Sequence, residues 1–547
     1  MKNKAPIINV LDFFTSKGGG SRRGIIALVV VSGLASGFLL AVINAAAEMA
    51  ANSEVQIRYF VLFGATLLLF TVAKRAALTR ATIAAERVIR DVRTRISNNI
   101  RHSDLLFVEN VGRGDIYARL TQDTSIISQA VPVIFNGYQS AVVLLAGLIY
   151  IATVSWLAFL LTLGFLVVGG YAYTRHARKN IIDIMHATAK EAEFFDSLSH
   201  LVDGFKEIKI NHAKNDGVYE RVTSIADETE MLMVRSGLRY VNHLVVAQTI
   251  VYLLIATIVF VLPTLDFANP ERILKLTASV LFIVGPLELV FIAYHFQNKA
   301  SAALINIQDL EVRLDAALDH RDAAYVPCGP SPWLDFKTIT LENIHFQYPG
   351  EGTPFAVGPL NLTIERGTVT FIVGGNGCGK STLLKLLTGL YSPTSGKILI
   401  DGKSIGDAGY PEFREMFSAV FGDFHLFDRL YGLTNIDAQE VNNLLEEMEI
   451  GDKTRYIDGA FTDLDLSTGQ RKRLAMIVAK LENKPIYVFD EWAADQDPHF
   501  RKKFYEEMLP TLKAEGKTIL AVTHDDKYFK HSDQLVKLDY GRFTDPD

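Results

Sequence analysis

A glycine-rich segment that ends in lysine, serine and threonine lies between an apolar run, Val369–Val373, and a helix-like segment, Leu383–Leu390. It fits the pattern G-x-x-x-x-G-K-[ST], in which glycines let backbone N–H groups surround phosphates and the helix N-terminus adds positive potential. Lys380 would reach the β- and γ-phosphates, and the Ser381 hydroxyl would ligate Mg²⁺. The predicted phosphate loop comprises Gly374, Gly375, Asn376, Gly377, Cys378, Gly379, Lys380, Ser381 and Thr382.

Residues 486–491 read Ile-Tyr-Val-Phe-Asp-Glu, which is a second apolar segment that ends in two neighbouring acids. A strand that ends this way would deliver Asp490 to the Mg²⁺ shell. Glu491 could then polarise the attacking water as a general base. Such a pair is common by itself, but its position downstream of a phosphate loop predicts hydrolysis of a nucleoside triphosphate.

Leu-Ser-Thr-Gly-Gln occupies residues 466–470, between these two segments, at the start of a helix-like stretch. Here the sequence resembles ABC transporters, whose signature at this place is usually LSGGQ; Thr468 is the departure. The resemblance implies that Ser467, Thr468, Gly469 and Gln470 bind ATP held by the opposite subunit, through a hydroxyl, N–H groups and the helix dipole. The plainer alternative is a polar helix cap.

Further elements of the family can be placed on this chain. Tyr348 matches the aromatic residue that stacks on adenine, His524 matches the histidine that senses the γ-phosphate, and 494–497 matches the loop through which the two ATP sites communicate. One departure is Gly422, which stands where the family has a glutamine that contacts Mg²⁺ and water. Either Asp423 or water is expected to replace that contact, or the coordination is looser. The helical subdomain between this loop and the signature also looks shortened.

The first half of the chain is predicted to cross a membrane. Apolar residues make up 49% of the sequence and mean hydropathy is +0.18, and a spanning helix needs roughly 20 mainly apolar residues. The first run could be taken for a signal peptide, but its length and the runs after it favour an uncleaved anchor. The six runs are Gly24–Ala47, Tyr59–Ala73, Ile134–Thr153, Trp156–Tyr173, Leu244–Pro263 and Ile273–Phe296.

Lys and Arg gather at the N-terminus and in the long connections after the second and fourth runs. This bias predicts that both termini are cytoplasmic. Both long connections have helical periodicity with a break near the middle, at 110–115 and around 194–204. They are either plain helical hairpins or levers whose tips dock on the ATPase. Glu288 follows Pro286 inside the sixth run, and a carboxylate there is costly unless it faces water or a partner. It is a protonated or paired residue that faces the bundle, or part of a site for polar or cationic cargo, or else the span has other bounds than these.

The sequence therefore predicts a helical membrane domain followed by an α/β P-loop ATPase domain. Its expected divisions are a transmembrane domain at 1–300, a linker at 301–333 and a nucleotide-binding domain at 334–547. The net charge of −6 argues against nucleic-acid binding. Two cysteines, Cys328 and Cys378, cannot form a disulfide framework and suit a reducing cytoplasm.

One phosphate loop and one signature in the chain predict a homodimer, with a heterodimer as the alternative. The arrangement resembles ABC exporters, and motifs in the last quarter resemble the bacterial cyclic-peptide and siderophore exporters, including pyoverdine-type, syringomycin-type and lasso-peptide exporters. The resemblance implies an ATP- and Mg²⁺-dependent exporter of a peptide or siderophore-like compound in a bacterial inner membrane. The rival functions are a lipid or hydrophobic-drug flippase and an ATP-gated channel or regulator.

Overall fold

The computed structural model describes residues 22–51, 57–174, 177–265, 270–318, 331–349, 355–406, 409–433 and 435–544. The chain divides into two compact units. The first comprises Met1–Arg101 and Val108–Ala317, and the second comprises His102–Phe107 and Leu318–Asp547. Each unit is described by itself.

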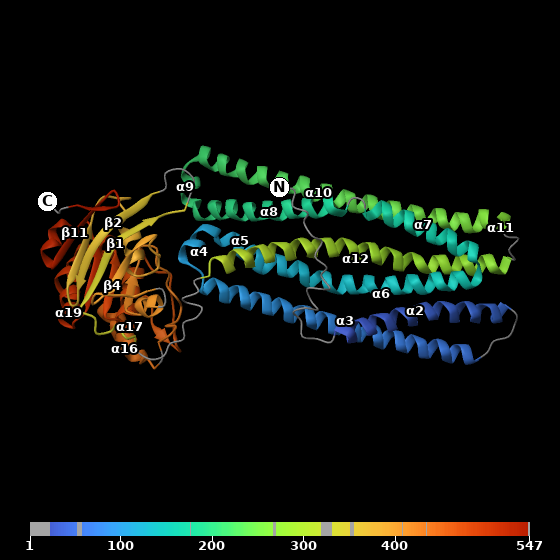
Figure 1. The fold of residues 1–547 in the computed structure, drawn as a ribbon, viewed down its shortest axis with the longest axis horizontal. Helices are drawn as coiled ribbons and strands as arrows, with labels where there is room; N and C mark the ends of the chain where they lie inside the picture. The colour runs from blue at the N-terminus through green and yellow to red at the C-terminus, as the bar shows by residue number, and fades with distance from the viewer. Residues whose placement is uncertain are drawn as a thin grey trace. The chain divides into compact units, whose positions relative to one another are not determined.

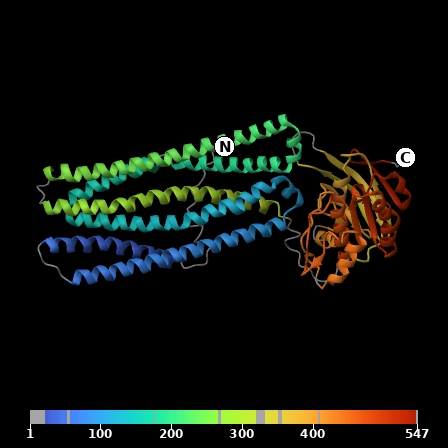
Figure 2. The same cartoon turned by 180° about the vertical axis from the view of Figure 1, so that it is seen from behind.

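Helices alone form the described part of the first unit (Figures 1 and 2). Helix α2 pairs with α3, α6 with α12, and α8 with α10. The main helices are α2 (Arg22–Ala51), α3 (Ile57–Arg101), α5 (Arg113–Ala118), η1 (Arg119–Asp123), α6 (Thr124–Val154), α7 (Trp156–Thr174), α8 (Ala177–Asp203), α9 (Phe205–Ile210), α10 (His212–Ala256), η2 (Thr257–Val261), α11 (Leu262–Leu265) and α12 (Pro270–Ala316).

All six predicted spans fall in helices. In the described part of the chain, four helices are long and apolar enough to cross a membrane, and they contain the first, second, third and sixth predicted spans. Shorter apolar helices, Trp156–Tyr171 and Gln248–Thr264, cover most of the fourth and fifth. Helix α12 continues to Ala316, so the segment 301–333 begins as helix.

Glycine allows α6 to lie close against its neighbours. A Cβ on Gly137 would fall 2.1 Å from the Cβ of Ala293 in α12, and one on Gly37 in α2 would fall 2.4 Å from the Cβ of Ala146. Such small residues let helix backbones approach in an apolar environment, where packing rather than water exclusion drives association. The α2, α6 and α12 helices are therefore packed through small-residue contacts.

Both predicted breaks in the long connections are present. Gly112, with φ 79°, separates α4 (Leu105–Val111) from α5, and Gly204 separates α8 from α9. Beyond the first break, Asp115 accepts from Arg119 Nε at 2.8 Å and pairs with Arg313 Nη2 of α12 at 2.7 Å. This carboxylate therefore ties α5 to η1 and to α12.

The second unit contains a four-stranded antiparallel sheet, ordered β2-β1-β4-β5, and a six-stranded sheet, ordered β12-β11-β3-β10-β9-β6. In the larger sheet every pairing is parallel except that of β11 with β12. The strands are β1 (Thr338–Gln347), β2 (Ala356–Glu365), β3 (Val369–Val373), β4 (Ser395–Ile400), β5 (Lys403–Ser404), β6 (Phe417–Val420), β9 (Ile486–Asp490), β10 (Thr518–Val522), β11 (Gln534–Asp539) and β12 (Arg542–Thr544).

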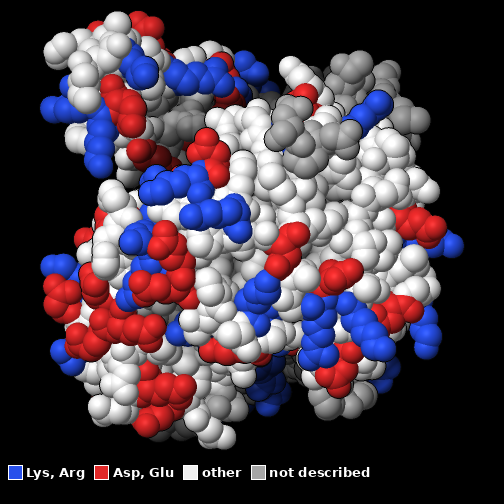
Figure 3. Space-filling view, turned by 90° about the vertical axis from the view of Figure 1, so that its left-hand side faces the viewer, with Lys and Arg blue, Asp and Glu red and all other residues white. Residues whose placement is uncertain are grey.

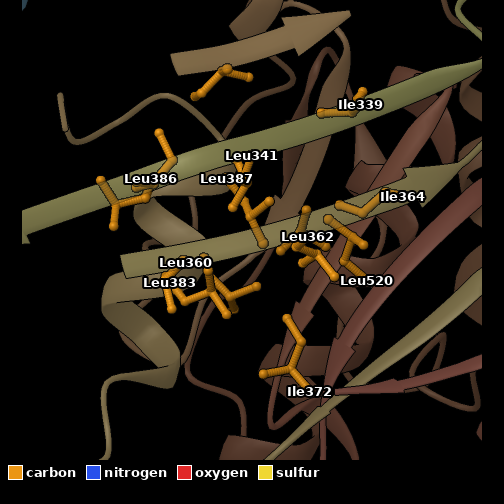
Figure 4. Close-up of a cluster of buried hydrophobic side chains, with 14 of the residues drawn as sticks. Ile339, Leu341, Leu360, Leu362, Ile364, Ile372, Leu383, Leu386, Leu387 and Leu520 are labelled. Atoms are coloured by element: carbon orange, nitrogen blue, oxygen red, sulfur yellow. The ribbon is translucent and has the colours of Figure 1, made fainter. Parts of the chain in front are cut away.

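Helix α14 (Lys380–Leu387) packs with both sheets in one hydrophobic core. Its Leu383 and Leu387 share the cluster with Leu360 of β2 and with Ile372 and Leu520 of β3 and β10 (Figure 4). The start of α14, which follows the phosphate loop, is thus fixed by burial of its apolar face. On the face shown in Figure 3, basic and acidic side chains both occur, in groups of either sign among uncharged residues.

Most of the remaining helices of the second unit pack in a second hydrophobic cluster, whereas Tyr410 and Phe413 of the short helix α15 (Tyr410–Arg414) lie in the cluster of α14. Helix α17 (Thr468–Glu482) follows the signature and contributes Leu474 and Ile477 to a second hydrophobic cluster with Phe489 of β9. The short helices are α15 (Tyr410–Arg414), α16 (Ala438–Glu447), η4 (Trp492–Asp495), α18 (Pro498–Lys503), η5 (Phe504–Met508), α19 (Leu509–Ala514) and η6 (Asp526–His531). A small hairpin pairs β7 (Tyr456–Ile457) with β8 (Ala460–Phe461).

Candidate functional site: a nucleotide site at the edge of the larger sheet

The phosphate loop leaves β3 and enters α14, as the sequence predicts. Gly379 caps the helix with φ 108°, and a Cβ on Gly374 would fall 2.2 Å from the carbonyl oxygen of Leu538, so both positions require glycine. Lys380 is 7% exposed and its Nζ donates to the carbonyl oxygens of Gly374 and Gly375, each at 3.0 Å. The loop therefore holds an ammonium group beside the exposed N-terminus of a helix, which is suited to binding phosphate.

Ser381 and Asp490 meet at the predicted metal position. The Ser381 hydroxyl donates to Asp490 Oδ2 at 3.2 Å, and Asp490 is 6% exposed at the end of β9. Burial raises the pKa of the Asp490 carboxyl, although hydrogen bonds from Ser381 and from the Gly422 backbone act in the opposite direction. A hydroxyl and a carboxylate at this separation fit Mg²⁺, which takes few protein oxygens and completes its shell with water and phosphate.

Glu491 and His524 lie at the ends of the neighbouring parallel strands β9 and β10. His524 Nε2 is 3.1 Å from Glu491 Oε1, and Lys380 Nζ is 3.9 Å from the same oxygen. Glu491 has a left-handed backbone, with φ 50° and ψ 38°. Because the carboxyl ends of parallel strands meet at one sheet edge, residues distant in sequence converge there. A carboxylate, an imidazole and an ammonium group thus surround one point, which suits activation of water beside a phosphate.

Tyr348 lies beside the phosphate loop, and its hydroxyl is 2.9 Å from Thr382 Oγ1. Phe355 is a second aromatic residue there, which the sequence motifs do not predict. The Cζ atom of Phe355 lies 3.3 Å from the position of a Cβ on Gly379, and the Tyr348 and Phe355 ring centroids are 6.5 Å apart. The backbone N–H of Tyr348 also donates to the Phe355 carbonyl. In the sequence, the one sign of this second residue is that an apolar aromatic side chain follows shortly after Tyr348.

The signature segment forms an N-terminal cap. Ser467 precedes α17, the Gln470 N–H donates to its Oγ at 3.4 Å, and the Ser467 N–H donates to Gln470 Oε1 at 3.0 Å, which is a capping box. Within one chain, this segment therefore forms a polar helix cap, which is the plainer alternative to an ATP contact. No hydrogen bond or ion pair among the described residues joins 467–470 to the phosphate loop.

Gly422 contacts the site through its backbone. Its N–H donates to the Asp490 carboxylate, and a Cβ there would lie 3.6 Å from Asp490 Oδ2, an ordinary contact distance. Asp423 is exposed and forms no hydrogen bond or ion pair with any residue that the structure describes, so its metal role stays a prediction. The described residues contain no cluster of three His, Cys, Asp or Glu arranged for a metal.

Glu288 is half-buried in α12, within the sixth predicted span. It forms no hydrogen bond or ion pair with the described residues. A pairing of Glu288 within the bundle is thus not seen in the described part of one chain. The role of Glu288 in binding cargo remains a prediction.

Two family models match this chain. The family model "ABC transporter" matches residues 357–494, and the model "ABC transporter transmembrane region" matches residues 24–264. The ATP-binding protein SyrD of Pseudomonas syringae pv. syringae is 33% identical over 526 residues, covering 93% of this chain and 91% of that protein. An ATP-dependent lipid A-core flippase of Hahella chejuensis is 25% identical over 482 residues, covering 81% and 77%.

A bacterial Atm1-family ABC exporter with ATP bound has a similar fold. Its TM-score is 0.75 at 19% identity, covering 96% of this chain and 94% of that one. The helical unit and the ATPase unit accord with these matches. The chain belongs to the ABC transporter family and is an exporter-type half-transporter that hydrolyses ATP.

Proposed function

We propose that this chain works as a homodimer in a bacterial inner membrane, with both termini cytoplasmic, and exports a peptide or siderophore-like compound. The observation that carries the dimer is the separation of functions within one chain. The phosphate loop, Asp490, Glu491 and His524 lie together, whereas no hydrogen bond or ion pair among the described residues joins Ser467 or Gln470 to that loop. A closed twofold pair would give each ATP a phosphate loop from one subunit and a signature from the other.

The chemical step follows from the positions of the side chains. Lys380 would neutralise the β- and γ-phosphates, and Tyr348 with Phe355 would hold the base. Glu491 would accept the proton of the attacking water, while His524 fixes the carboxylate and contacts the γ-phosphate. Ser381 and Asp490 would hold Mg²⁺, which would supply positive charge to offset that of the phosphates.

The chain passes between its two compact units at Arg101/His102 and at Phe107/Val108. Within the second unit, Leu105 and Leu106 pack against the hydrophobic cluster that holds α14. We propose that closure of the ATPase units is transmitted to the membrane helices through this segment and through the α9 connection.

The cargo class rests on the subfamily resemblance and on Glu288. A half-buried carboxylate in a span suits a cargo with cationic or polar groups. The competing proposal is a lipid flippase, which the match to proteins named lipid A-core flippases favours.

The test is cargo-stimulated ATPase activity in proteoliposomes, compared among cyclic peptides, siderophores and lipids. Stimulation by a peptide or siderophore that is lost in Glu288→Gln and kept in Glu271→Gln supports the proposal. Glu271 is a matched control because it is exposed on the first turn of the same helix. Stimulation by lipids alone would establish the flippase, and conductance sustained by Glu491→Gln with bound ATP would establish a channel.

A further inference from the structure

Lys472 is a buried charged residue on α17 that has no role in the site described so far. It is 3% exposed. Its Nζ donates to the backbone carbonyl oxygen of Glu491 at 2.6 Å and pairs with Asp495 Oδ2 at 2.6 Å. Burying an ammonium group is costly unless it is paired and hydrogen-bonded. Both partners come from the segment that contains the catalytic glutamate and the loop after it.

The surrounding contacts fix Lys472 in place. Its own carbonyl oxygen accepts from Trp492 Nε1 at 2.8 Å. Trp492 is buried and stacks on Phe504, with ring centroids 4.6 Å apart. The helix α17 and the segment after β9 are thus joined in both directions, by a side chain from each to the backbone of the other.

The signature is also joined to the segment after β9, at the residue that follows Asp495. Gln496 Nε2 donates to the Gly469 carbonyl oxygen at 3.0 Å, and Arg473 Nε donates to Gln496 Oε1 at 3.0 Å. A Cβ on Gly469 would fall 2.8 Å from the Asp495 carbonyl oxygen, so the two backbones lie in contact. Signature and catalytic segments therefore form one packed structure within a subunit.

Glu491 needs this support because its backbone is unusual. A non-glycine residue in the left-handed region is strained, and it keeps that backbone only where its surroundings hold it. The Glu491 N–H donates to the Val522 carbonyl, and its own carbonyl accepts from both Lys472 Nζ and the Ala494 N–H. Among the described hydrogen bonds of this peptide, that of Lys472 is the one that comes from the signature helix.

We propose that Lys472 is a positioning residue, which holds the backbone of Glu491 so that its carboxylate faces the attacking water, and which ties that position to the signature of the same subunit. The inference rests on the proposed homodimer. There, the signature of one subunit serves the opposite ATP, while its Glu491 serves its own ATP. Displacement of the signature would then reach the other site through Lys472.

The first test compares steady-state ATPase activity of the full-length protein in proteoliposomes. Since a misplacement of about 1 Å can cost about 100-fold, we expect Lys472→Met to lower kcat by about 10- to 100-fold. ATP binding and KM should change less than about threefold, because no phosphate contact is lost. Lys480→Met is the matched control on the same helix, where Nζ pairs only loosely with Glu447 at 3.6 Å.

Two further variants separate positioning from folding. Lys472→Arg keeps the charge and should recover part of kcat, whereas Asp495→Asn keeps the contact to Glu491 and should lose less activity than Lys472→Met. Equal kcat in Lys472→Met and Lys480→Met, in a preparation whose wild type hydrolyses ATP, would overturn the proposal. Wild-type protein that neither dimerises nor responds to any cargo would instead overturn the proposed function.

The second test uses dimers purified through two tags, with Glu491→Gln in one subunit so that only the partner's glutamate works. Lys472→Met in the subunit with intact Glu491 should slow the remaining site, and the same change in the Glu491→Gln subunit should slow it much less. The reverse order would show that Lys472 acts on the signature alone and would overturn the proposal. If the dimer with Glu491→Gln in one subunit and no change at Lys472 is inactive, the kcat and KM of the homodimeric variants decide whether the proposal holds.

Discussion

His524 Nε2 lies 3.1 Å from Glu491 Oε1. The two residues are far apart in sequence, and adjacent parallel strands β10 and β9 bring them together. One ring nitrogen of the imidazole is thus engaged by the carboxylate that would accept a proton from water. The contact restricts the carboxylate and leaves the second ring nitrogen available to the γ-phosphate.

The first prediction concerns this pair. Glu491→Gln should lower kcat by about 100- to 10,000-fold, the range for loss of a general base, while ATP binding stays close to that of the wild type. His524→Ala should lower kcat within the same range. The measurements are steady-state hydrolysis and equilibrium binding of a labelled nucleotide. If the two residues act as a unit, the double variant will be little slower than the slower single variant, and multiplicative losses would show that they act independently.

The second prediction concerns Gly422. A Cβ there meets Asp490 Oδ2 at an ordinary distance of 3.6 Å, so a longer side chain fits without displacing the strand. Gly422→Gln should fold normally and lower the Mg²⁺ concentration that gives half-maximal ATPase activity, because an amide oxygen becomes available to the ion. Gly422→Ala is the control and should leave that concentration unchanged. An increase in the Gln variant would mean that the backbone contact to Asp490 was lost.

Sequence patterns predicted the parts of this molecule that are local. The phosphate loop requires left-handed glycines between a strand and a helix, and the spans require continuous apolar runs, so each is visible in a short window. The sequence shows that Gly422 lacks the side chain of the family's glutamine. Its backbone hydrogen bond to Asp490, however, depends on the pairing of β6 with β9. Lys472 resembles any basic residue on a helix until the fold buries it beneath Glu491. Contacts of this kind depend on tertiary packing.

The third prediction concerns Phe355. Its ring borders Gly379 and neighbours Tyr348, so it should form a second wall against the base. Aromatic–base stacking is worth about 1–3 kcal/mol, so Phe355→Ala should raise KM for ATP by about fivefold or more with little change in kcat. Phe355→Tyr should restore KM. Phe427→Ala, which removes another exposed ring of the same unit, is the control. A loss confined to kcat would place Phe355 outside the binding site.

The fourth prediction concerns Cys378 in the phosphate loop. The thiol is 5% exposed, and its Sγ lies 2.7 Å from the position of a Cβ on Gly374. A bulky adduct has no room there and would distort the loop, so modification by a thiol reagent should abolish ATPase activity and ATP should protect. Burial predicts slow labelling. Cys378→Ser should resist the reagent, which separates this thiol from Cys328. Full activity after labelling of Cys378, confirmed by mass spectrometry, would contradict the geometry of the loop.

The last prediction concerns Asp115, which joins α5, η1 and α12 through Arg119 and Arg313. The Asp115 side chain is 28% exposed, so the pair with Arg313 is more sheltered than an ordinary surface pair. A double-mutant cycle with Asp115→Asn and Arg313→Gln should give a coupling of roughly 1–2 kcal/mol in the unfolding free energy of the full chain.

Asp91→Asn is the control, because its pair with Arg90 is exposed on both sides and should contribute less than about 0.5 kcal/mol. If this helical junction transmits motion, Asp115→Asn will keep basal ATPase activity and lose most of its stimulation by cargo, since hydrolysis needs only the nucleotide site and coupling needs the helices to move together. Loss of basal and stimulated activity in equal proportion would assign Asp115 to the stability of the chain alone.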